Sequence, residues 1–103
     1  AKIEELKADK QAIGYTENPN PFTTHKIQLQ AGDLIYIFSD GFADQFGGPK
    51  GKKFMLKRLQ ELLVETSAMD MKEQQVAMEK AFDDWKGDEF PQIDDVLLMG
   101  IEP

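Results

Sequence analysis

The stretch that decides the fold is LIYIFSDGFADQ (residues 34–45), in which a run of apolar residues leads directly into Asp40 and Gly41. The run over residues 34–38 is short, continuous and rich in aromatic and branched side chains, which predicts a fully buried β-strand. A carboxylate at the end of such a strand has a rigid support on one side and an opening on the other. Because Asp-Gly is also a common turn dipeptide, the motif is either an ordinary turn or the rim of a metal site.

A second acidic motif, Asp94 and Asp95, comes directly before the apolar run VLLMGI (residues 96–101). If the two predicted strands pair antiparallel, the end of one adjoins the start of the other, so Asp40 and Asp94 meet at the same edge of the sheet. Carboxylates that converge repel one another unless a cation neutralises them. A divalent metal site is the economical interpretation, and a turn that precedes a strand is the alternative that the residues leave open.

Two amphipathic helices are predicted between these strands. The first has apolar residues at helical spacing, namely Met55 or Leu56, then Leu59, Leu62 and Leu63. The second begins at Asp70, whose side chain can cap the first turn while Glu73 reaches back, and Gly87 is placed to end it. Its apolar stripe, which we interpret as core, consists of Met78, Ala81, Phe82 and Trp85.

The sequence pattern predicts strands and turns in the N-terminal third of the chain. Residues 25–30 alternate polar and apolar side chains, which is typical of a half-buried strand, and residues 31–33 form a tight turn that makes a hairpin with the next strand. One or two short strands are expected in residues 1–16, followed by a proline-containing loop. The fold class is therefore α+β, with an antiparallel sheet and two helices packed on one face.

Composition narrows the possible functions. Cysteine is absent, which excludes disulfides and thiolate metal sites, and the single histidine, His25, begins an edge-like strand and is expected at the surface. The formal net charge of −7 argues against a nucleic-acid partner and is compatible with Mg²⁺ or Mn²⁺. The sequence starts with polar residues and has neither an initiator Met nor an apolar leader, which indicates a piece of a longer chain. We expect it to be cytoplasmic, either in a free protein or as the cytoplasmic part of a membrane-attached sensor.

Other phosphate chemistries fit the sequence poorly. Residues 47–53, GGPKGKK, lack the P-loop spacing and have no Ser or Thr after the lysine, so a mobile loop entering the first helix is expected there. Phe38 stands where an aspartyl-phosphate hydrolase would carry its nucleophile. The acidic pair precedes its strand, whereas in a response-regulator receiver it follows.

The order GDLIYIFSDGFAD, glycine-rich loop, leucine-rich helix, second helix and QIDDVLLMGI resembles the C-terminal half of SpoIIE-type bacterial phosphatases, metal-dependent serine/threonine phosphatases of the PPM superfamily. The resemblance implies that residues 1–103 are one partial domain, part of an α-β-β-α sandwich. It implies hydrolysis of phosphoserine or phosphothreonine on a bacterial regulatory protein, such as an anti-sigma-factor antagonist, under an upstream sensor domain. The first half of the domain, with further metal ligands, is absent from residues 1–33.

Carried over by position, the resemblance assigns Asp40 and Asp94 as ligands of Mn²⁺ or Mg²⁺, two ions in the complete domain, with Asp95 as a less certain third ligand. Gly41 and Asp44 would lie next to these ligands and help to position them without binding the metal. Residues 96–97 are Val-Leu where the family usually has Ile-Thr. The alternative function is a non-catalytic regulatory or protein-interaction domain of the same fold. We expect the isolated chain to be inactive, and to self-associate through an apolar sheet face that the missing half would cover.

Overall fold

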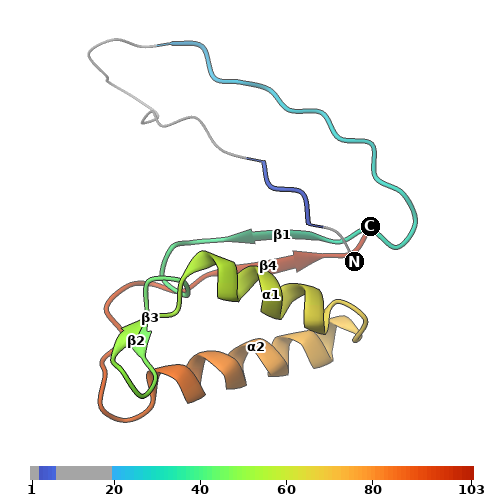
Figure 1. Cartoon of the computed structure of the whole chain (residues 1–103). Coiled ribbons are helices and arrows are strands. Elements are labelled where there is room, and N and C mark those ends of the chain that lie inside the picture. The colour runs from blue at the N-terminus through green and yellow to red at the C-terminus, as the bar shows by residue number, and fades with distance from the viewer. Residues whose placement is uncertain (1–2, 7–19) are drawn as a thin grey trace.

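A computed structural model describes residues 3–6 and 20–103 of the chain. The element order is β1 (Ile35–Phe38), β2 (Phe46–Gly47), β3 (Lys52–Lys53), α1 (Leu56–Thr66), α2 (Met71–Lys86) and β4 (Leu98–Ile101). The strands form two small antiparallel sheets, β1–β4 and β2–β3, and both helices lie on the same side of β1–β4 (Figure 1). The α+β class and the packing of the helices on one face are confirmed. In the described part of the chain neither helix has the length and apolar character of a membrane span.

The sheet β1–β4 has one covered face and one open face. Tyr36 pairs with Gly100 on the helix side, and the Tyr36 hydroxyl donates a hydrogen bond to Gln74 of α2 (2.5 Å). On the opposite face Ile37 pairs with Met99, and these side chains are 53% and 48% exposed. The prediction of two fully buried strands is therefore wrong for this chain, because both helices cover the same face, whereas the open apolar face expected of a partial domain is present.

The hydrophobic core lies between the helices and the loop that follows β1. Its buried members are Phe42, Phe54, Leu59, Leu63, Met78 and Phe82. Phe42 packs edge-to-face against Phe54 and Phe82, with ring centroids 5.1 and 5.2 Å apart. Because Phe42 comes directly after the Asp-Gly motif, the core fixes the start of the loop that carries Asp40.

Both helices agree with their sequence patterns. The buried residues Leu59 and Leu63 lie on the predicted apolar stripe of α1, whereas Met55 and Leu56 at its start are exposed. Asp70 is the N-cap of α2, where its Oδ1 accepts a hydrogen bond from the Glu73 N–H (2.8 Å). Gly87 ends α2 with a φ of 60°, a conformation that costs glycine little.

The strand predicted over residues 25–30 is absent, and the loop predicted over residues 47–53 contains short strand segments. Residues 25–30 form no strand, although the turn after them is present, with Gly32 at a φ of 91° and the Asp33 N–H bonded to the Gln30 carbonyl (3.0 Å). The Gln30 N–H donates to the Asp33 carboxylate (2.8 Å), so the donor that would begin a hairpin ladder is already used. Residues 47–53, predicted as a mobile loop, contain part of the β2–β3 ribbon.

The strands predicted within residues 1–16 fall mostly outside the described residues, and residues 3–6 form no strand. His25 is exposed, as predicted. The last strand begins at Leu98, two residues later than its apolar run.

Candidate metal centre

The two acidic motifs lie at the same end of β1–β4. Phe38, the last residue of β1, pairs with Leu98, the first residue of β4. One step beyond this pair, the Ser39 N–H donates a hydrogen bond to the Leu97 carbonyl (2.9 Å). Asp40 therefore leaves β1 at the end where Asp94 and Asp95 lead into β4, which is the topology expected from two antiparallel neighbours.

Ser39 joins the two segments through its side chain as well. Its hydroxyl oxygen accepts a hydrogen bond from the Leu97 N–H (3.0 Å), and the same hydroxyl donates to the main-chain oxygen of Asp95 (3.0 Å). The Ser39 side chain thus extends the pairing of the two segments beyond the last paired residues of β1 and β4. Sequence reasoning missed this residue, although a serine directly before an Asp-Gly motif at a strand end was the available signal.

Gly41 permits the closest approach between the two segments. It is buried and is absent from the described residues with positive φ, so close contact, and not an unusual backbone conformation, explains the glycine. A β-carbon at Gly41 would lie 2.3 Å from the main-chain oxygen of Asp95 and 3.1 Å from a methyl of Val96. No side chain fits there unless the backbone moves.

The carboxylates themselves are open to solvent. Asp40, Asp94 and Asp95 are all exposed. Over residues 3–6 and 20–103 the structure brings together no group of three His or acidic side chains that could hold a metal ion. Exposed carboxylates are the donors that Mg²⁺ and Mn²⁺ prefer, so this end of the sheet fits part of a metal site, and further ligands have to come from elsewhere.

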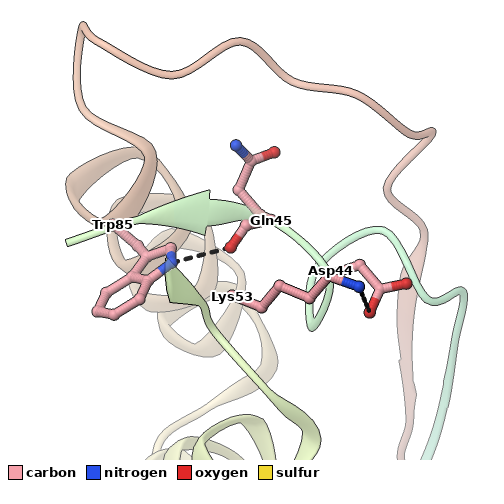
Figure 2. Close-up of polar contacts among 4 residues, drawn as sticks. All are labelled: Asp44, Gln45, Lys53 and Trp85. Atoms are coloured by element: carbon pink, nitrogen blue, oxygen red, sulfur yellow. Dashed lines mark hydrogen bonds and ion pairs between the residues drawn. The ribbon is translucent and has the colours of Figure 1, made fainter. Parts of the chain in front are cut away.

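The Asp44 side chain contacts the β2–β3 ribbon, and its main chain contacts Asp40. Its N–H donates to the Asp40 carbonyl (2.9 Å), which closes a turn after the Asp-Gly motif. Its carboxylate lies 3.7 Å from the Lys53 ammonium of β3 (Figure 2). Both side chains are about two-fifths exposed, so this ion pair contributes at most about 1 kcal/mol.

The loop is locked to α2 on its far side. The main-chain oxygen of Gln45 accepts a hydrogen bond from the Trp85 indole N–H (2.9 Å; Figure 2). It accepts a second one from the Phe54 N–H (3.0 Å). The Gly48 N–H donates to the Trp85 carbonyl (2.9 Å). The Arg58 guanidinium lies 4.4 Å from the centre of the Trp85 ring and covers its face. The acidic end of β1 is therefore supported by the core.

The family model for Stage II sporulation protein E (SpoIIE) matches residues 1–103. The chain is similar to the SiaA-PP2C domain of Pseudomonas aeruginosa, with a TM-score of 0.75 and 28% identity over 81% of this chain. It spans 34% of that chain, about a third of its length. No curated protein matches the sequence significantly. Since the family model covers the whole length, this chain, with its acidic motifs after β1 and before β4, belongs to the SpoIIE family.

Proposed function

We propose that this chain is the C-terminal part of a metal-dependent phosphatase domain that removes phosphate from phosphoserine or phosphothreonine on a bacterial regulatory protein. One observation carries the proposal: Ser39 and Gly41 hold the Asp40 loop against the main chain of Asp95. Family membership and similarity to a PP2C domain support the same activity. A phosphorylated anti-sigma-factor antagonist is the proposed substrate, with an upstream sensor domain in the same protein as regulator.

Asp40 and Asp94 would hold Mn²⁺ or Mg²⁺, with Asp95 beside them. When bound, such ions lower the pKa of a coordinated water and neutralise phosphoryl oxygens. The chain's own contribution is to present these carboxylates from a rigid junction, since Ser39 and Gly41 fix the main chain on both sides of it.

The described residues supply only part of a ligand set. We therefore expect the 103-residue chain to bind Mn²⁺ weakly or not at all and to be inactive alone. The same observation favours a second candidate, a non-catalytic regulatory or interaction domain that keeps the fold. A further Asp-Gly metal motif in the preceding part of the protein supports the enzyme, and its absence supports the interaction domain.

The test uses the longer protein that contains a complete domain. Asp40→Asn and Asp94→Asn should each abolish Mn²⁺-dependent hydrolysis of a phosphopeptide and leave the melting temperature unchanged. Asp88→Asn is the matched control, because Asp88 is an exposed acid in the turn after α2. Wild-type rates in the Asp40 or Asp94 variant would show that the two motifs serve only as turns.

A further inference from the structure

We propose that Gln45 is a positioning residue that couples the loop carrying Asp40 to the loop carrying Asp94. The inference rests on the proposed function only in treating these two acids as metal ligands. Gln45 is 1% exposed, the most buried polar residue among those described. Its side-chain Nε2 donates hydrogen bonds to the carbonyls of Pro91 and Phe46, each at 3.0 Å.

The contact with Pro91 gives the acidic loop a second anchor. On one side of Asp94, the main chain of Asp95 is held by the Ser39 hydroxyl (3.0 Å) and by close packing on Gly41. On the other side, three residues before Asp94, Pro91 is held by Gln45. A loop held at one point can pivot, whereas a loop held on both sides presents its carboxylate in one place.

Gln45 can serve as an anchor because its own main chain is fixed. Its carbonyl accepts from the Trp85 indole and the Phe54 N–H, and its N–H donates to the Phe42 carbonyl (3.3 Å). Figure 2 shows the side chain pointing away from Trp85. The backbone of Gln45 therefore bonds to the core and to α2, while its amide reaches the loop that follows α2.

The side chain of Gln45 contributes little net stability to the fold. The Gln45 Oε1 atom is buried and accepts no hydrogen bond from the described residues. A buried unpaired acceptor is unfavourable and offsets much of what the two N–H bonds contribute to stability. Methionine has nearly the same length and no polar atoms, so Gln45→Met should change stability little while it removes the link to Pro91.

Gln74 offers a matched control. It is a glutamine of similar burial (4% exposed), and its side chain also makes two hydrogen bonds, with Tyr36 and with the Met69 carbonyl. These bonds join α2 to β1 and to the preceding turn, and none of them involves the loops that carry the acidic motifs. Gln74→Met therefore tests the general effect of losing a buried amide.

The first measurement is amide hydrogen exchange on the 103-residue chain. In Gln45→Met, the amide of Leu97, which donates to the Ser39 hydroxyl (3.0 Å), should exchange about tenfold faster, which corresponds to losing about one hydrogen bond of net stabilisation. Gln45→Leu, which also removes the amide donors and adds no charge, should behave alike. Gln74→Met should leave exchange at Leu97 unchanged. Unchanged exchange in both Gln45 variants, or equal acceleration in Gln74→Met, overturns the coupling whatever the activity of the protein.

The second measurement is calorimetric titration of the complete domain with Mn²⁺ alone. Gln45→Met should raise the Kd for Mn²⁺ about tenfold, because the carboxylate is less well positioned before the ion binds. Faster exchange with an unchanged Kd would reject the positioning role. If the wild-type domain binds no Mn²⁺, the proposed function fails, and the exchange result still decides whether Gln45 couples the two loops.

Discussion

A β-carbon placed on Gly41 would lie 2.3 Å from the main-chain oxygen of Asp95, closer than any real contact of this kind. The glycine of the Asp-Gly motif is thus the point at which two segments more than fifty residues apart in sequence touch. It distinguishes this motif from a solvent-exposed turn, where a side chain at that position would meet only water.

Gly41→Ala should destabilise the fold by about 1–3 kcal/mol, because the obstructing atom belongs to the backbone and cannot rotate away. Thermal unfolding measures the effect. Gly100→Ala is the control, since its β-carbon would meet only side chains: the Met71 Cε (2.7 Å), which can move, and the edge of the Tyr36 ring (3.2 Å), which would have to shift by a few tenths of an ångström. Equal melting temperatures for the two variants would contradict the close contact.

Ser39→Ala should cost about 1 kcal/mol and should speed hydrogen exchange at the Leu97 amide, which loses its side-chain acceptor. Ser39→Thr keeps the hydroxyl and suits an extended backbone, so it should restore most of the protection. Exchange measured by NMR on the three proteins decides this. A threonine variant as weak as the alanine variant would argue that the serine acts only through its size.

The 103-residue chain should self-associate through the open face of β1–β4, where Ile37 pairs with Met99 and both are exposed. Changing both residues to Thr should shift the chain toward monomer, as measured by light scattering over a concentration series. Val76→Thr removes an equally exposed apolar side chain from α2 and should change nothing. A wild-type chain that is strictly monomeric at all concentrations would refute this prediction.

Stability should fall at alkaline pH through Tyr36. Burial raises the pKa of the Tyr36 hydroxyl above its ordinary value of about 10, since the charged form is poorly solvated in the fold. A raised folded-state pKa contributes stability that is fully present below the unfolded pKa and is lost as pH rises through the folded pKa. Urea unfolding above pH ~10 should therefore show a steeper decline for wild type than for Tyr36→Phe. Parallel declines would show that the hydroxyl is not desolvated.

The local pattern of the sequence determined α1 and α2, because apolar spacing, the Asp70 cap and the Gly87 end all act within a few residues. The order of the motifs was enough to predict the family, whereas the antiparallel pairing of the two apolar runs entered as a condition that the structure confirms. The placement of Asp40 and Asp94 at one end of a sheet was also predictable, because antiparallel pairing of neighbours dictates it.

Tertiary structure alone decided the rest. Gln45 looks like an ordinary polar loop residue, and only the packing of α2 and the return of the chain at Pro91 bury it. The apolar run of β1 predicts burial on both faces, but burial requires a second layer, and both helices of this chain lie on the same side. Each of these outcomes depends on contacts between residues far apart in sequence, which no local pattern encodes.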